Sequence, residues 1–160
     1  MMFPFFPKSK SLEEVSSSKL FDENGFYKAF VRDLLGCKEE VIIESPFVST
    51  SRMELLRPIF TNLISKGVKI HIVTRDPIEH DESNRHFATN EILSYKEMGV
   101  NIILLNGYHH RKLAILDQSV LWEGSLNILS HCRSKEIMRR IEGKKSAKEM
   151  MDFLSLKKVI

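Results

Sequence analysis

Short apolar runs alternate with amphipathic segments between Glu40 and Leu105, and this alternation constrains the fold more than any other feature of the sequence. The runs Glu40–Phe47, Val68–Val73 and Val100–Leu105 are rich in β-branched residues, as expected of buried strands. The segments between them place apolar residues at helical spacing and end at glycine, which is typical of helices. This order of elements predicts a largely parallel sheet that helices cover on both faces.

The sequence on either side of this alternation predicts further elements. We expect a helix from Asp22 or Asn24 to Gly36, a helix after Ser49 that Pro58 kinks or delays, a helix over Arg85–Met98, an antiparallel strand pair within residues 108–124, a strand over Ser134–Ile141 and a helix over Ser146–Leu154. The serine-rich stretch Ser11–Leu20 is typical of a linker. We therefore predict an α/β fold in which residues 21–160 form a single domain after an N-terminal extension, residues 1–20.

The stretch from Tyr108 to Asn127 concentrates polar side chains that suit chemistry on a phosphodiester. His110 and Lys112 are two residues apart, so on an extended strand they point to the same face. A turn at Asp117 and a second strand then bring Ser125 and Asn127 back towards them. An imidazole, an ammonium, a hydroxyl and an amide at one point can attack phosphorus and bind the non-bridging oxygens.

The spacing H-x-K, four residues, D, six residues, G-S-x-N resembles the HKD motif of the phospholipase D superfamily, through His110, Lys112, Asp117, Gly124, Ser125 and Asn127. The layout between Phe26 and Phe153 is similar to the compact, nuclease-like branch, whose members carry one motif per chain. The resemblance implies a phospholipase D-like sandwich, with a mixed, largely parallel sheet between helices. It also implies a phosphodiesterase that needs no metal or other cofactor, works through a phosphohistidine and shares its active site across a homodimer.

Three neighbouring positions need separate interpretation. Asp117 belongs to the motif and so to its candidate catalytic set, but its odd parity relative to His110 and its place at a turn favour a structural role. A nucleophilic imidazole needs its far nitrogen held by an acid. Glu136 is our candidate, because related nucleases carry an acid at about this distance beyond the G-S-x-N segment. His109 faces the opposite way from His110, and we interpret it as structural.

Charge and composition narrow the partners. The net charge of the 160 residues is +3, and basic residues gather after His131, which favours a polyanion such as nucleic acid. We assign substrate binding to Lys112, Ser125, Asn127 and Arg133. No apolar run is long enough to span a bilayer, and the two cysteines show neither a disulfide framework nor a zinc spacing, so we expect a cytoplasmic protein without stable membrane association. The apolar residues 1–7 lack the features of a secretory signal.

Other functions are weighed against this one. The loop residues Asp76, His80, Asp81, Glu82 and His86 could bind a divalent metal, but they show no repeated ligand spacing. Ser125 does not fit the G-x-S-x-G elbow of serine hydrolases. We therefore predict a metal-independent nuclease that cleaves DNA or RNA. A phospholipid head-group hydrolase and a non-catalytic nucleic-acid-binding module remain the alternatives.

Overall fold

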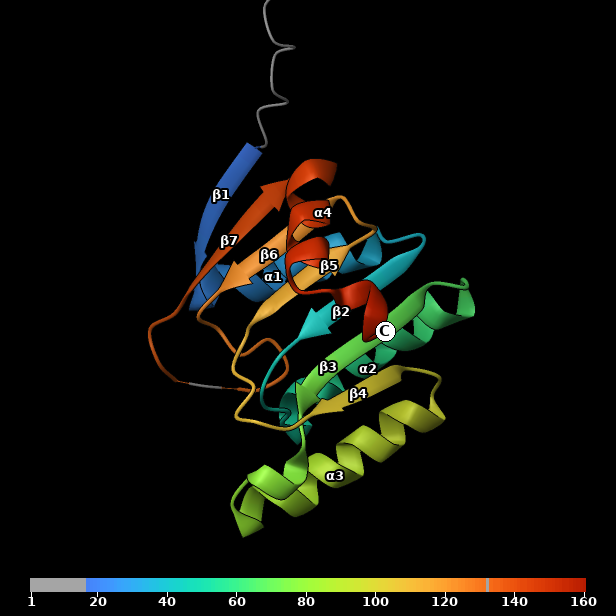
Figure 1. Ribbon diagram of the computed structural model, residues 1–160, viewed down its shortest axis with the longest axis vertical. Coiled ribbons are helices and arrows are strands. Elements are labelled where there is room, and N and C mark those ends of the chain that lie inside the picture. Colours follow the sequence, from blue (N-terminus) through green and yellow to red (C-terminus); the bar gives the residue numbers. More distant parts are fainter. Residues whose placement is uncertain (1–16, 132) are drawn as a thin grey trace, which may run out of the picture.

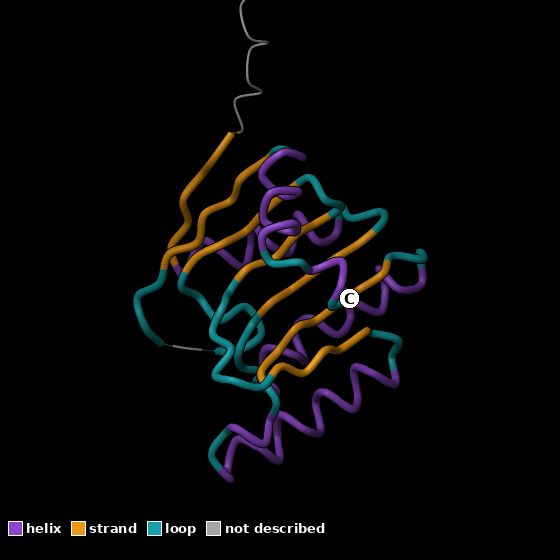
Figure 2. Tube along the Cα trace, in the orientation of Figure 1, coloured by secondary structure: helices purple, strands orange, loops and turns teal. Residues whose placement is uncertain are grey.

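The computed structural model describes residues 17–131 and 133–160, which form a seven-stranded sheet with helices on both faces (Figures 1 and 2). The strand order is β1-β7-β6-β5-β2-β3-β4. The strands are β1 (Ser17–Asp22), β2 (Glu40–Glu44), β3 (Lys69–Arg75), β4 (Asn101–Leu105), β5 (Leu113–Leu116), β6 (Val120–Gly124) and β7 (Ile137–Glu142). The helices are α1 (Glu23–Leu35), α2 (Thr50–Ser65), α3 (Glu82–Glu97) and α4 (Lys144–Phe153), with short 3-10 turns η1 (Pro77–Glu79) and η2 (Leu156–Lys158).

The sheet is mixed and mostly antiparallel, so the prediction of a largely parallel sheet was wrong. Only β2–β3 and β3–β4 pair in parallel, through crossovers that contain α2 and α3. The pairs β2–β5, β5–β6, β6–β7 and β1–β7 are antiparallel. The difference arises because the motif strands β5 and β6 are joined by a tight turn, which permits only antiparallel pairing, and because β7 and β1 extend the same edge.

Two hydrophobic clusters fix the helices to opposite faces of the sheet. Alternate residues of β2 show the division, since Val41 and Ile43 join the cluster that contains the apolar faces of α1, α2 and α3, whereas Ile42 joins the cluster beneath α4 and η2. In Figure 1, α4 lies in front of the sheet and α1 and α2 lie behind it. Because α4 is short, it covers only part of its face.

The local signals located most elements, with shifted ends. Asp22 caps α1 as predicted, its carboxylate accepting from the Gly25 amide at 2.7 Å. Helix α3 starts at Glu82 rather than Arg85, because Asp81 caps it. Helix α2 begins at Thr50 and contains Pro58, so a late start is excluded. The interpretation of Ser11–Leu20 as a linker was wrong for residues 17–20, which belong to β1, while residues 1–16 lie outside the described part. No described helix is both long and apolar enough to cross a membrane.

Candidate active site

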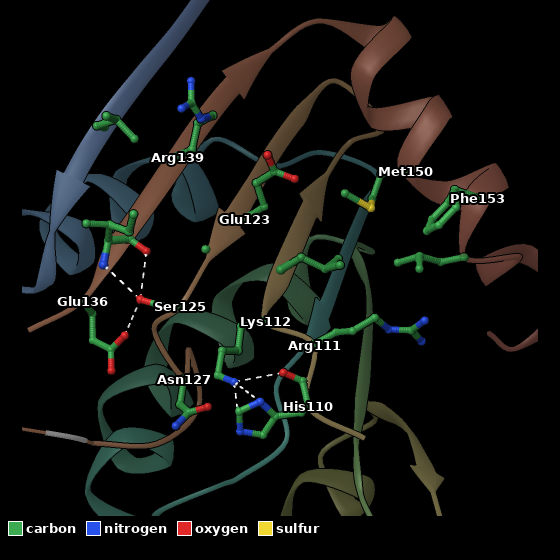
Figure 3. A pocket seen from close by; sticks show the side chains of 15 residues that line it. His110, Arg111, Lys112, Glu123, Ser125, Asn127, Glu136, Arg139, Met150 and Phe153 are labelled. Atoms are coloured by element: carbon green, nitrogen blue, oxygen red, sulfur yellow. Dashed lines mark hydrogen bonds between the residues drawn. The ribbon is translucent and has the colours of Figure 1, made fainter. Parts of the chain in front are cut away.

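His110 and Lys112 lie together on the extended segment that immediately precedes β5. The sequence predicted that both residues lie within a strand. The ladder with β6 starts only at Leu113, so they lie just before the strand instead. The Lys112 ammonium nitrogen is 2.8 Å from Nδ1 and 3.2 Å from Nε2 of the His110 ring, and it donates to the His110 carbonyl at 2.9 Å (Figure 3).

Strand β6 returns the chain to the same place and ends at Gly124. A Cβ at Gly124 would stand 2.2 Å from the Ile137 carbonyl oxygen of β7, so only glycine permits this close approach. Ser125 follows, and its amide donates to that same carbonyl at 3.0 Å. Its hydroxyl accepts from the Ile137 amide at 3.1 Å and donates to Glu136. The glycine of the motif therefore sets how tightly the turn that carries Ser125 packs on β7.

Asn127 places a side-chain amide near the Lys112 ammonium (Figure 3). Its Oδ1 atom is buried and has no hydrogen-bond partner within residues 17–131 and 133–160. Unpaired buried polar atoms are rare in proteins, and this one belongs to a residue that lines the cleft described below.

Glu136 lies on the loop before β7, and its carboxylate accepts hydrogen bonds from Ser125 and from Ser134, the latter at 2.7 Å. Burial lowers the pKa of Lys112, and the negative charge of Glu136 opposes that shift. Glu136 therefore supports both the hydroxyl and the cation of the site. Its predicted action on the tautomer of His110 stays a prediction.

These five side chains line one open cleft of about 930 Å³ on the α4 side of the sheet. His110, Lys112, Ser125, Asn127 and Glu136 form its polar end (Figure 3). Met150 and Phe153 lie away from these side chains and mark its apolar end (Figure 3), and the rest of the lining includes Leu20, Leu113, Ile137 and Leu154 together with Arg111, Glu123 and Arg139. The cleft thus joins a cluster of polar side chains to an exposed apolar surface.

Asp117 does not belong to this cleft. It lies at the opposite end of β5, where its carboxylate accepts from the amides of Lys38, Glu39 and Glu40 at 2.8–2.9 Å. The third letter of the motif therefore holds the entry of β2 against the β5–β6 turn, and its inclusion among the candidate catalytic residues is not supported by its position.

Comparison with known proteins agrees with this geometry. The family model described as "Cardiolipin synthase, PLD-like domain" matches residues 30–156, most of the chain. The chain belongs to the phospholipase D superfamily. Among curated relatives, cardiolipin synthase A of Buchnera aphidicola is 28% identical over 123 residues, which are 76% of this chain and 24% of that protein. The superfamily member described here thus spans about a quarter of the length of the curated relatives it matches.

Two solved structures share the fold. Nuc from Salmonella typhimurium, titled a phospholipase D family member, is 18% identical with a TM-score of 0.67, over 86% of this chain and 91% of that one. Phosphatidylserine synthase of Haemophilus influenzae is 13% identical with a TM-score of 0.69, over 92% of this chain and 40% of that one. The α/β phospholipase D-like architecture predicted from the sequence is therefore confirmed, apart from the direction of its strands.

Other predicted binding residues lie outside the phospholipase D-type cleft. Arg133 lines a neighbouring hollow with Arg52 and Lys135. In the loop at 76–86, Asp76 accepts from the Ile78 amide and Asp81 from the Asn84 amide, so both act as caps. Within the described ranges, no three histidine, cysteine, aspartate or glutamate side chains are grouped as a metal would require.

Sequence reasoning missed Glu44, which ends β2 and is completely buried. Its carboxylate accepts from Arg111, whose Nε lies 2.7 Å from Oε2. The signal was available, since an acidic residue closes the apolar run EVIIE next to a proline-containing turn. The side chain of His109 packs on the same carboxylate and is only 6% exposed, and burial lowers the pKa of its imidazole to about 4. This placement fits the structural interpretation of His109.

Proposed function

We propose that this chain is a metal-independent phosphodiesterase that acts through a phosphohistidine at His110. The observation that carries the proposal is the convergence of His110, Lys112 and Asn127 on one open cleft. A ring nitrogen of His110 attacks phosphorus, and the bond from phosphorus to the leaving oxygen breaks. Lys112 and Asn127 bind the equatorial oxygens as charge develops on them. Water then attacks the phosphorus atom and forms a new phosphorus–oxygen bond, while the phosphorus–nitrogen bond breaks and returns its electron pair to His110.

The leaving oxygen needs a proton from an acid in the cleft. The choice of residues that could supply this proton favours an active site shared by two subunits. Among the described residues that line the cleft, His110 is the only histidine. His109 packs against Glu44 instead, and His131 lines other hollows. We therefore propose that His110 of the partner subunit protonates the leaving group and later activates the water.

Nucleic acid is the substrate that we favour, on the basis of charge. Arg139 lines the cleft, and Lys157 and Lys158 are exposed on η2. The basic C-terminal segment is weaker than its sequence suggested, because at least Lys135, Arg140 and Lys148 form ion pairs within the chain. The near end-to-end match to the compact Nuc structure also fits the single-motif branch.

A phospholipid is the second candidate, and the apolar end of the cleft favours it. Leu20, Ile137 and Phe153 are 57%, 62% and 83% exposed beside the polar end. Exposed apolar side chains next to a phosphate-binding group could accept the acyl region of a lipid. Two of the similar proteins are named as synthases of phospholipids.

The two substrates can be separated with one panel. Purified protein is incubated with EDTA and with labelled single-stranded DNA, duplex DNA, RNA, or liposomes of phosphatidylcholine or cardiolipin. We expect cleavage of nucleic acid that persists in EDTA, weakens as salt rises, and leaves a covalent adduct on the peptide that contains His110. Strict dependence on added Mg²⁺ or Mn²⁺ would overturn the mechanism, and binding without cleavage would favour a targeting module.

A pair of surface variants tests the lipid alternative directly. Replacing Phe153 with serine should abolish liposome hydrolysis if the apolar end binds acyl chains, and should leave nucleic-acid cleavage intact. Leu93→Ser is the matched control, because Leu93 is 52% exposed on α3, away from the cleft. Equal liposome hydrolysis by the two variants would show that the apolar end of the cleft has no role in lipid hydrolysis.

A further inference from the structure

The catalytic segment 109–112 precedes the first residue of the β5 ladder, so its position depends on contacts beyond the sheet. Its side chains alternate. His110 and Lys112 line the polar end of the cleft, while His109 and Arg111 contact Glu44, although Arg111 also borders the cleft. In Figure 3 the guanidinium of Arg111 extends away from His110 and Lys112. The odd-numbered side chains thus attach the segment to β2, and the even-numbered ones lie at the polar end of the cleft.

The contact with Glu44 has two points and a fixed geometry. Arg111 donates from Nε to Oε2 at 2.7 Å and from Nη2 to Oε1 at 3.2 Å. Such a paired contact between two planar groups defines orientation as well as distance. The ring of His109 adds packing on the same side, with Nε2 at 3.8 Å from Oε2. Three atoms of neighbouring residues therefore meet one carboxylate that β2 holds in place.

Glu44 is a costly residue for this position if stability were its only purpose. Its side chain is completely buried, at the end of a strand whose other central residues are apolar. Burying a carboxylate is unfavourable unless it is paired, and a buried ion pair is often no more stabilising than apolar residues of similar size. Stability alone therefore does not explain why Glu44 is buried here. Its contacts with His109 and Arg111, the residues on either side of His110, suggest another purpose.

We infer that Glu44 is a positioning residue, which holds Arg111 and His109 so that His110 and Lys112 face the scissile phosphate together. The inference rests on the proposed function, since it assigns Glu44 to the same site. Glu44 acts through the backbone of the segment and touches no substrate. A shift of about 1 Å in a nucleophile is enough to lower turnover about 100-fold.

The principal test is Glu44→Gln, which keeps the size of the side chain and removes its charge. We expect kcat to fall about 100-fold while KM changes less than about threefold, and we expect Glu44→Asp to recover part of the loss. The matched control is Asp33→Asn. Asp33 makes a similar two-point contact with Arg140, at 2.6 Å and 3.4 Å, away from the cleft. This control should lower thermal stability and leave kcat unchanged.

A second variant separates position from stability. Glu44→Leu combined with Arg111→Met removes both charges together, so the protein should fold with nearly unchanged stability. We expect its kcat to be as low as that of Glu44→Gln. Wild-type kcat in this stable double variant would overturn the inference, and so would a rise in KM at unchanged kcat, because that result would assign Arg111 to substrate binding.

A readout without substrate distinguishes this inference from the proposed function. The imidazole resonances of His110 in NMR spectra should move in Glu44→Gln and stay in place in Asp33→Asn. If the wild-type chain cleaves no phosphodiester but the resonances move as expected, the proposed function fails and the positioning of His110 stands. Unmoved resonances in Glu44→Gln would overturn the positioning whatever the activity.

Discussion

The two ends of strand β5 carry residues of the same HKD motif, but these residues differ in their surroundings and in their contacts. At one end, His110 and Lys112 contact each other at the mouth of an open cleft. At the other end, roughly 13 Å along the four-residue strand, Asp117 accepts hydrogen bonds from three backbone amides and does not line the cleft. One sequence motif can therefore contain both candidate catalytic residues and a residue that stabilises the fold. Substitutions at the two ends of β5 should then have different effects.

Removing the nucleophile should have the largest effect. His110→Ala is expected to lower kcat about 10⁴-fold or more, since the covalent step is lost, while the melting temperature stays within about 1 °C of wild type because the side chain is exposed. Steady-state kinetics and thermal denaturation measure the two quantities. His86→Ala is the matched control, because His86 is an exposed histidine on α3. Residual turnover above about 1% in His110→Ala would assign the nucleophile to another residue.

Lys112→Ala tests the cation at the same end. The variant should lose about 10²- to 10³-fold in kcat/KM, because an ammonium stabilises the charge on the equatorial oxygens. Affinity for a phosphate analogue such as vanadate, measured by isothermal titration calorimetry, should fall as well. Unchanged analogue affinity would contradict the role of Lys112 in phosphate binding.

The sequence predicted the cleft end better than the rest of the molecule. Spacing alone brought His110, Lys112, Ser125 and Asn127 together, because a short hairpin returns the chain to its start. It could not predict that β7 and β1 would extend the antiparallel edge, since pairing between distant strands leaves no local signal.

Long-range contacts explain the other errors of prediction as well. The buried contact of Glu44 with Arg111 joins residues 67 positions apart. The spacing of apolar residues along a helix or a strand gives no information about contacts between residues this far apart. Likewise, the three amides that donate to Asp117 belong to residues nearly 80 positions earlier. Parity therefore indicated a structural role for Asp117, but the sequence could not identify its partners.

Glu136→Gln should have a smaller effect than the two preceding variants. The neutral amide lacks the charge that opposes the desolvation of Lys112 and should weaken the support that we predict for the His110 tautomer, so kcat should fall about 100-fold with little change in KM. Single-turnover and steady-state kinetics separate the two parameters. Equal turnover in the variant would exclude Glu136 from the mechanism and restrict it to bonding Ser125 and Ser134.

Mixing subunits should give only a twofold effect, but it tests whether the cleft end is complete within one chain. Wild-type and His110→Ala chains are co-refolded in equal amounts, so that one quarter of the dimers are fully wild type and hold half of the wild-type chains. Mixed dimers lack one of the two imidazoles, and activity per wild-type chain should drop to roughly half. Constant activity per wild-type chain would show that each chain works alone, and would direct attention to His109 and His131.

Asp117→Asn should have the smallest effect on turnover, and it tests the opposite end of the strand. Asp117 has φ 47°, a left-handed conformation that asparagine tolerates, so the substitution changes hydrogen bonding without adding backbone strain. The amide loses the charge that strengthens three hydrogen bonds, and we expect the free energy of unfolding to fall by about 1–3 kcal/mol. Denaturant titration measures this loss, and kcat should remain within about twofold of wild type. A large fall in kcat at wild-type stability would show that the two ends of β5 are coupled, since Asp117 could then affect His110 only through the strand that joins them.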